Sequence, residues 1–120
     1  MATTITITHT PPITLITLNR PEVHNAFNET LIAELTEAFE SLREDAATRV
    51  VILQGEGKSF CAGADLNWMG KIVNYSVTEN LEDARALSRM FEAIDQCPKP
   101  VVGRIHGAAM GGGAGLVAVC

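Results

Sequence analysis

Two apolar runs, each followed by a turn of small residues, constrain the fold of this chain most strongly. Val50–Gln54 precedes a loop that ends in Ala-Gly-Ala-Asp at Asp65, and Val101–Ile105 precedes Gly-Gly-Gly-Ala-Gly, which ends at Gly115. Continuous apolar runs of this length are typical of strands buried on both faces of a parallel sheet. Because a helix start follows each turn, the pattern predicts an α/β fold with two similar strand-to-helix turns side by side.

The other elements are expected around these two runs. Alternating Thr and Ile over Thr3–His9 predict a half-buried strand that forms a hairpin with Ile13–Asn19. Asn28 can cap one helix, Ser76 opens a capping box for another, and Gly113–Cys120 starts a third. Apolar residues at helical spacing predict the core-facing stripes of the first two helices, which are Leu31, Leu35, Phe39 and Leu42, then Leu81, Ala84, Leu87, Phe91 and Ile94.

Composition and charge exclude several function classes. The chain has 120 residues, of which 47% are hydrophobic and 19% charged, so it is globular rather than disordered. Its net charge is −5 and it has no basic block, which argues against nucleic acid and anionic membranes as partners. Cys61, Cys97 and Cys120 lack metal-ligand spacing and no secretory signal is visible, so we expect a reduced, cytoplasmic protein without metal. All three cysteines are expected in or near the core.

Both small-residue turns can present unpaired backbone N–H groups to a ligand. A turn that leads from a strand into a helix leaves such donors free, and small side chains let a ligand approach the backbone. Two converging turns can bind one oxygen atom with two donors, as an oxyanion hole does. When either turn is taken alone, tight helix–strand packing is the more common reason for its small residues. The glycines match neither a dinucleotide-binding fingerprint nor a P-loop.

Three motifs in one order resemble the enoyl-CoA hydratase/isomerase (crotonase) superfamily. The similarity covers essentially the whole chain. The motifs are Asn19-Arg20-Pro21 with Asn25-Ala26, then Ser59 to Leu66 (SFCAGADL), then Lys99 to Val102 (KPVV) leading into Gly107 to Gly113 (GAAMGGG). The resemblance implies a crotonase-like spiral of β-β-α units that is incomplete in this chain. Residues 1–120 would be the N-terminal part of a single domain, with the C-terminal part absent.

The same resemblance implies an acyl-CoA substrate and names its binding residues. The thioester oxygen would accept hydrogen bonds from the N–H groups of Ala64 and Gly112. No cofactor would be needed, since coenzyme A is part of the substrate, and the complete protein would form homotrimers or dimers of trimers. The residues implied in substrate and CoA binding are Val23, His24, Ala62, Ala64, Asp65, Leu66, Asn67 and Gly112.

One position departs from the superfamily's pattern. Gly115 stands where many relatives keep the first of two catalytic glutamates, and glycine cannot transfer a proton. Asp65 is expected to cap a short helix and His106 to serve at a strand end, rather than to act as acid or base. Trp68 and Met69 are expected to pack over the acyl pocket.

The resulting expectation is a lyase that hydrates a 2-enoyl-CoA. The run Asn67-Trp68-Met69 together with Gly115 is similar to methylglutaconyl-CoA hydratase-like members of leucine and terpenoid degradation. A Δ3-Δ2 enoyl-CoA isomerase, which needs a single base, and a non-catalytic CoA-binding fragment are the alternatives. A polypeptide of these 120 residues alone is expected to be inactive.

Overall fold

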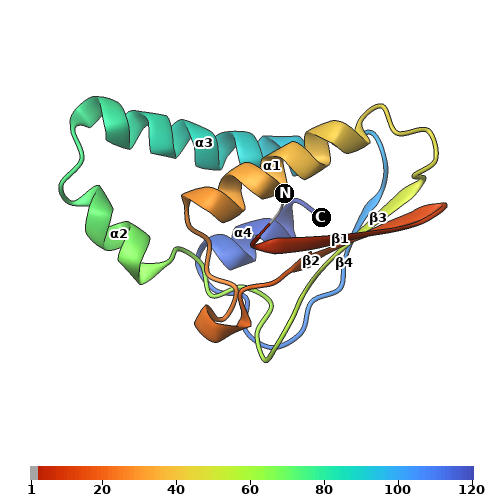
Figure 1. Ribbon diagram of the computed structural model, residues 1–120, viewed down its shortest axis with the longest axis horizontal. Coiled ribbons are helices and arrows are strands. Elements are labelled where there is room, and N and C mark those ends of the chain that lie inside the picture. The colour runs from red at the N-terminus through yellow and green to blue at the C-terminus, as the bar shows by residue number, and fades with distance from the viewer. Residues whose placement is uncertain (1–2) are drawn as a thin grey trace.

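The computed structural model describes residues 3–120 as a four-stranded sheet with helices packed against it (Figure 1). The elements in chain order are β1 (Ile5–Thr10), β2 (Ile13–Leu18), the 3-10 helix η1 (Pro21–Val23), α1 (Glu29–Leu42), β3 (Val50–Gly55), α2 (Leu66–Ile72), α3 (Val77–Asp95), β4 (Val101–Gly103) and α4 (Gly112–Ala118). The alternation of strands and helices confirms the predicted α/β fold.

The sheet has the order β1-β2-β3-β4, so neighbouring strands follow one another in sequence. β1 and β2 form the predicted antiparallel hairpin, whereas β2, β3 and β4 run parallel. Ile16 of β2 lies opposite Leu53 of β3, and Val51 lies opposite Val101 of β4. Parallel neighbours require long crossovers, which α1 supplies between β2 and β3 and α3 supplies between β3 and β4.

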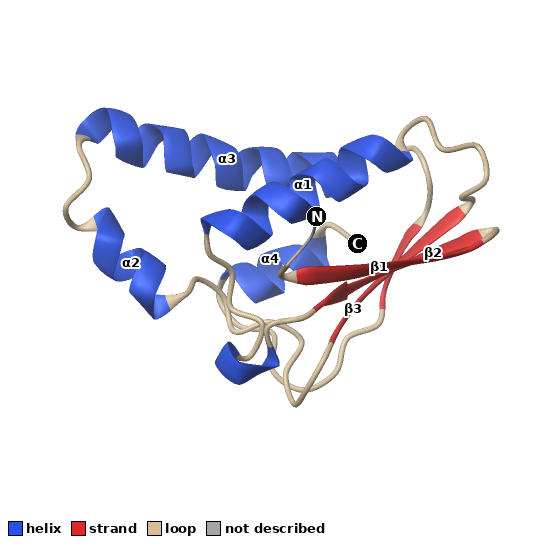
Figure 2. Ribbon diagram, viewed as in Figure 1, coloured by secondary structure: helices blue, strands red, loops and turns tan. Residues whose placement is uncertain are grey.

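The core lies between the sheet and the helical layer. α1 and α3 lie side by side, and α4 lies on the same side of the sheet as α1 (Figure 2). Leu35 and Phe39 of α1 are fully buried with Ile16 and Leu53 of the sheet, as the spacing predicts. Truncating a buried phenylalanine such as Phe39 to alanine typically costs about 3–5 kcal/mol, so this layer fixes the position of α1.

The predicted caps of α1 and α3 are confirmed. The Asn28 side chain accepts a hydrogen bond from the Leu31 N–H at 3.0 Å. Ser76 and Glu79 form a reciprocal capping box, in which each side chain accepts from the other residue's N–H at 3.1 Å. Caps of this kind stabilise a helix by about 1 kcal/mol, and they set where α1 and α3 begin.

The expected apolar stripe of α3 is wrong in its first half. Leu81 is 47% exposed and Ala84 is also exposed, whereas Met90 and Ile94 are buried. The first turns of α3 project beyond the end of α1, together with α2 (Figure 1). Helical spacing predicts which residues share a face, but the buried length of that face depends on the neighbouring helix.

The strands are less buried than the sequence predicts. β3 is buried on one face only, because Ile52 is half-buried although both of its neighbours are fully buried. Val102 of β4 is 51% exposed, and β4 ends at Gly103 rather than at Ile105. Leu15, Ile52 and Val102 pair in register and form an aligned apolar row across the outward face.

β1 differs from prediction in the same way. Its alternating pattern predicts a buried face, yet only Ile5 is buried and Ile7 is exposed, because little of α1 contacts β1 at the edge of the sheet. Cys61 is buried and Cys97 half-buried as expected, but Cys120 is exposed. Within residues 3–120, no helix has both the length and the apolar character that crossing a bilayer requires.

Candidate functional site

The two small-residue turns lie side by side, as the sequence predicts. Cys61 pairs with Ala109 in an isolated parallel bridge. The Cys61 N–H donates to the Ala108 carbonyl at 3.2 Å, and the Met110 N–H donates to the Cys61 carbonyl at 3.0 Å. These bonds join the loop after β3 to the loop after β4 just before each helix begins.

A second bridge fixes the other side of the first turn. Phe27 pairs with Ala64: its N–H donates to the Gly63 carbonyl at 2.8 Å, and its carbonyl accepts from the Asp65 N–H at 2.9 Å. The segment before α1 therefore holds the first turn from one side while the Met110 loop holds it from the other. Three segments far apart in sequence meet here.

Two backbone donors remain free at this junction. The N–H groups of Ala64 and Gly112 have no acceptor among residues 3–120. Gly63 has φ +97°, and a Cβ placed on it would lie 3.4 Å from the Gly112 nitrogen, so the two turns touch through main-chain atoms. Paired N–H donors of this kind can stabilise negative charge that develops on one oxygen atom.

Close packing also requires small residues at the second turn. A Cβ on Gly112 would lie 2.1 Å from Cζ of Phe27, and one on Gly113 would lie 2.2 Å from the Cys61 carbonyl oxygen. Contacts that short cannot exist, so a side chain at either position would force α4 or its neighbour to move. The sequence leaves two explanations open, packing and donor exposure. Both apply at this turn, because its glycines pack closely and the Gly112 N–H is free.

A pocket of about 520 Å³ opens beside Ala64. Seven of the eight residues implied in substrate and CoA binding line this pocket, and Gly112 is the exception. The lining residues are Val23, His24, Ala26, Ala62, Ala64, Asp65, Leu66 and Asn67. They come from the end of η1, the loop before α1, the first turn and the start of α2, so the fold gathers a set that is scattered in sequence.

Asp65 caps α2 and is also ion-paired. Its carboxylate accepts from the N–H groups of Asn67 and Trp68 at 2.7 and 3.2 Å, and it contacts the Arg20 guanidinium at 3.0 Å. Burial by itself raises the pKa of Asp65, but the hydrogen bonds from Trp68, Arg20 and Asn67 outweigh burial and hold this pKa below its ordinary value. The predicted cap is confirmed, and a carboxylate held ionised in this way is a poor proton donor.

Asn25 is a structural centre of the site that the sequence does not reveal. It is fully buried at φ +56°; its side chain accepts from the Arg20 N–H at 2.8 Å and donates to the carbonyls of Glu56 and Ser59 at 2.8 and 3.0 Å. Asn25 thus ties the loop before α1 to the loop after β3. The residues near Asn25 in sequence do not predict this role, because two of its partners lie more than 30 residues away in the chain.

The two histidines near the turns have different surroundings. Nε2 of His106 lies 2.6 Å from the Gly57 carbonyl, which agrees with the expected role at the end of a strand. His24 lines the pocket, and its Nδ1 lies 3.3 Å from the Ser59 hydroxyl. Among residues 3–120, no group of three or more His, Cys, Asp or Glu side chains is arranged to hold a metal ion.

A phenylalanine ring occupies the space beside Gly115. A Cβ on Gly115 would lie 3.0 Å from both Cε1 and Cζ of Phe91. A glutamate at this position would therefore have to move the Phe91 ring. The position of the Phe91 ring thus fits a glycine at position 115 and not a larger carboxylate side chain.

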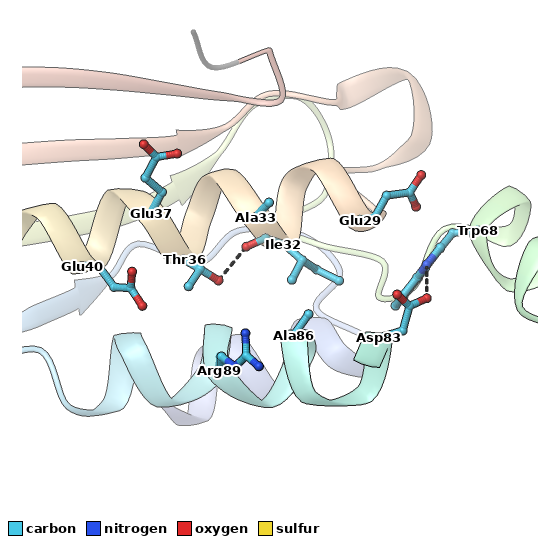
Figure 3. Close-up of a pocket in the computed structure, with 10 residues that line it drawn as sticks. All are labelled: Glu29, Ile32, Ala33, Thr36, Glu37, Glu40, Trp68, Asp83, Ala86 and Arg89. Carbon is cyan, nitrogen blue, oxygen red and sulfur yellow. Dashed lines mark hydrogen bonds between the residues drawn. The ribbon is translucent and has the colours of Figure 1, made fainter. Parts of the chain in front are cut away.

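Trp68 and Met69 do not line the pocket beside Ala64, and their expected packing over an acyl group stays a prediction. Trp68 faces a separate cavity of about 250 Å³ between α1 and α3, where its Nε1 donates to Asp83 at 3.2 Å (Figure 3). Met69 is 48% exposed. Trp68 turns toward α3 because the Asp65 cap sets the direction of α2 and Asp83 provides an acceptor for the indole.

Comparisons with known proteins find similarity over most of the chain. A sequence model of the enoyl-CoA hydratase/isomerase family matches residues 9–120. An enoyl-CoA hydratase of Alternaria alternata is 41% identical over 105 residues, which cover 88% of this chain and 33% of that protein. The mitochondrial Delta(3,5)-Delta(2,4)-dienoyl-CoA isomerase of Mus musculus is 35% identical over 116 residues, which cover 88% of this chain and 35% of that protein.

Solved structures extend the likeness to three dimensions. The crystal structure of an enoyl-CoA hydratase from Shewanella pealeana superposes with a TM-score of 0.95 at 35% identity. The match covers 98% of this chain and 44% of that one. The chain spans between a third and a half of the length of the proteins that it matches.

Proposed function

Because the chain belongs to the enoyl-CoA hydratase/isomerase family, we propose that the protein containing it hydrates a 2-enoyl-CoA thioester. The observation that carries this proposal is the pair of free backbone N–H groups, on Ala64 and Gly112, at two turns in direct contact. We assign both as donors to the thioester oxygen. The adjoining pocket, lined by His24, Asp65 and Asn67 among others, would accommodate the CoA portion.

The chemistry suits two main-chain donors. Addition of water places a hydroxyl on Cβ and a proton on Cα, and negative charge moves onto the thioester oxygen as the enolate forms. Donors already in position stabilise this charge without reorganisation, and removing one costs about 3–4 kcal/mol of barrier. Gly115 cannot move a proton and Asp65 is held by Arg20, so we propose that a carboxylate elsewhere in the complete protein performs proton transfer.

Substitution of Ala64 tests the assigned donor in the complete protein. Ala64→Pro removes the N–H, so we expect kcat for hydration to fall by about 100-fold to 1000-fold. Ala64→Gly keeps the N–H and serves as the matched control, with kcat expected within about threefold of the parent, less than 1 kcal/mol of barrier. Circular dichroism of both variants verifies folding. Equal kcat for the folded proline variant and the glycine variant would contradict the assignment.

A Δ3-Δ2 enoyl-CoA isomerase is the second candidate. Gly115 suits it equally well, because moving a double bond needs only one base, and one of the similar proteins is named as a dienoyl-CoA isomerase. Incubating the complete protein separately with a 2-enoyl-CoA and a 3-enoyl-CoA distinguishes the two activities by product. Binding of CoA without any product would support the third candidate, a non-catalytic CoA-binding protein.

The acyl group and the assembly are also proposals. We infer 3-methylglutaconyl-CoA as the substrate from the Asn67-Trp68-Met69 run and Gly115, and absence of its hydration by a protein active on other enoyl-CoAs would reject it. We propose a cytoplasmic homotrimer or dimer of trimers, which sedimentation of the complete protein tests. Residues 1–120 are proposed to be the N-terminal part of its single domain.

A further inference from the structure

A groove runs between α1 and α3, away from the two turns. Two adjoining cavities of about 250 and 590 Å³ form it, and Glu40 of α1 and Arg89 of α3 line both. The first cavity extends to Trp68 and the second to Gln96, so the groove follows most of the length of α1. None of its lining residues lines the pocket beside Ala64, so the groove is separate from the candidate site.

The floor of the groove is largely apolar and is made of small side chains. Ile32 and Thr36 of α1 face Ala86 of α3 across the gap (Figure 3), and Ala93 continues the line along α3. The Thr36 hydroxyl donates to the Ile32 carbonyl at 2.7 Å, so it needs no partner in the groove. Side chains this short leave space that an apolar side chain of another molecule can enter.

Negative charge is concentrated on the two helices that form the groove. Nine of the chain's fourteen acidic residues lie in α1 and α3, which hold only two of its nine lysine and arginine residues. The rest of the chain has more basic than acidic residues, although the net charge is −5. The groove itself is lined by five carboxylates and two arginines, which are Glu29, Glu37, Glu40, Asp83 and Glu92, with Arg43 and Arg89.

Most of these carboxylates lack a cationic partner in the part of the chain that the structure describes. Within residues 3–120, Glu29 is the one groove residue in an ion pair, which it forms with Lys71 at 3.5 Å. Glu40 and Glu92 are exposed and make no ion pair with residues 3–120. An apolar floor with an acidic rim is complementary to an apolar stripe flanked by lysine or arginine.

We propose that this groove is a docking site for a basic amphipathic helix of a partner protein. The apolar stripe of that helix enters the space beside Ile32 and Ala86, and its basic side chains meet Glu40 and Glu92. A helix suits the groove, because the groove lies between two helix surfaces and offers no strand edge for an extended peptide to pair with. Neither small-residue turn takes part, so the docking site does not require the proposed function.

Binding of a defined peptide to the complete protein tests this docking site. The probe is a fluorescein-labelled peptide of about 18 residues, long enough to span a 14-residue helix such as α1. It consists of alanine, leucine and lysine, with leucine on one helical face and lysine on both sides of that face. Fluorescence anisotropy yields its Kd. We expect binding at least about tenfold tighter than that of a peptide of the same composition whose leucines are scattered around the helix.

Charge reversal separates a specific site from general attraction to an acidic protein. Glu40→Lys combined with Glu92→Lys should weaken binding of the probe by about tenfold or more. The matched control combines Glu44→Lys with Glu82→Lys, because both glutamates are exposed and line neither cavity. The control makes the same change in net charge and should change the Kd by less than about threefold.

Filling the floor provides an uncharged measurement. Ala86→Leu places a larger side chain in the groove and should weaken binding of the probe by about fivefold or more. Ala84→Leu is the control, because Ala84 is exposed on the same helix and lines neither cavity, so the Kd should stay unchanged. Circular dichroism verifies folding, and the charge-reversal pair decides the matter if Ala86→Leu does not fold.

Three results would overturn the docking site. The first is equal weakening of the probe by the two double variants, because net charge alone would then account for binding. The second is failure of the complete protein to bind the probe. The third is dissociation of an oligomer by Glu40→Lys with Glu92→Lys but not by the control pair, seen by sedimentation, because the groove would then be an interface between copies of this chain.

Discussion

Asp65 shows how one carboxylate can cap a helix and fix a loop at the same time. Its side chain is 7% exposed and that of Arg20 is 15% exposed, so the ion pair is shielded from solvent. The Arg20 guanidinium also donates to the Ala26 carbonyl. One charged network thus holds the loop before α1 against the turn that presents the Ala64 N–H.

Asp65→Asn keeps a capping side chain and removes the charge. We expect the free energy of unfolding at pH 7 to fall by about 1–2 kcal/mol, a typical loss for a charged hydrogen bond. Because the folded-state pKa of Asp65 lies below its unfolded value, its contribution is complete above about pH 5 and is lost as pH falls through the folded pKa. Urea unfolding between pH 3 and 7 should therefore show a shallower decline for Asp65→Asn.

Asp95→Asn on the exposed end of α3 is the control for this measurement. Its unfolding free energy should match that of the parent within about 0.5 kcal/mol. An identical pH slope for parent and Asp65→Asn would contradict the role given to the ion pair.

Asn25→Ala should be more damaging. The substitution leaves the Arg20 N–H and two carbonyls without their buried partner and places alanine at φ +56°. We expect a loss of about 3 kcal/mol or more in unfolding free energy, measured by chemical denaturation. Asn74→Ala in the exposed turn between α2 and α3 should be nearly neutral, and comparable losses for the two variants would refute the role of Asn25.

Predictability from sequence depends on the distance between partners. The capping roles of Asn28, Asp65 and Ser76 follow from residues within a few positions. The partnership of Arg20 with Asp65 spans 45 residues, and that of Asn25 with Ser59 spans 34. Such pairs can be predicted only once the topology is known. For this reason the binding residues were predicted from the resemblance to a family and not from local sequence pattern.

At the scale of elements, α4 packs closely against the first turn because its first two residues are glycines. Gly113 is buried against the Cys61 carbonyl, so its backbone approaches the first turn more closely than any other residue type would allow. The contact between the two turns depends on this approach. Helix propensity alone would instead favour alanine at a helical glycine.

Two glycine-to-alanine variants separate these effects. Gly113→Ala should lower the thermal unfolding midpoint, because its Cβ would lie 2.2 Å from a carbonyl oxygen. Gly70→Ala in α2 meets open space and should raise unfolding free energy by about 0.5–1 kcal/mol through helix propensity. Differential scanning calorimetry of both tests the signs, and stabilisation by Gly113→Ala would contradict the packing described.

Element type was more predictable than burial. Each predicted strand and helix exists within a few residues of its expected bounds. The errors concern Leu81, Val102 and Ile7, which are exposed although their pattern is apolar. Periodicity reports which side of an element is apolar, whereas burial requires a neighbouring element to cover that side.

At the scale of the whole molecule, the sheet has an exposed edge and a partly exposed outward face. β4 is short and contains the half-exposed Val102, which continues the row of Leu15 and Ile52. Exposed strand edges with apolar side chains favour association between chains. The 120 residues thus present surface that an isolated domain normally covers.

A polypeptide of these 120 residues alone should neither hydrate enoyl-CoA nor remain monomeric. Among the carboxylates described, only Asp65 lines the pocket beside Ala64, and Arg20 holds it. We expect no turnover above background and concentration-dependent light scattering, with less scattering for Val102→Lys. Turnover by the purified polypeptide would contradict the need for a further proton-transfer group.

The donors assigned at Ala64 and Gly112 belong to the main chain, and this affects how such a protein can evolve. A substitution can abolish a catalytic side chain in one step, but most substitutions leave a peptide N–H in place. On the proposed function, substitutions around the two turns can therefore change which acyl-CoA is bound while the means of polarising the thioester is inherited unaltered. A single ancestral scaffold could thus give rise to hydratases and isomerases without rebuilding its electrophilic centre.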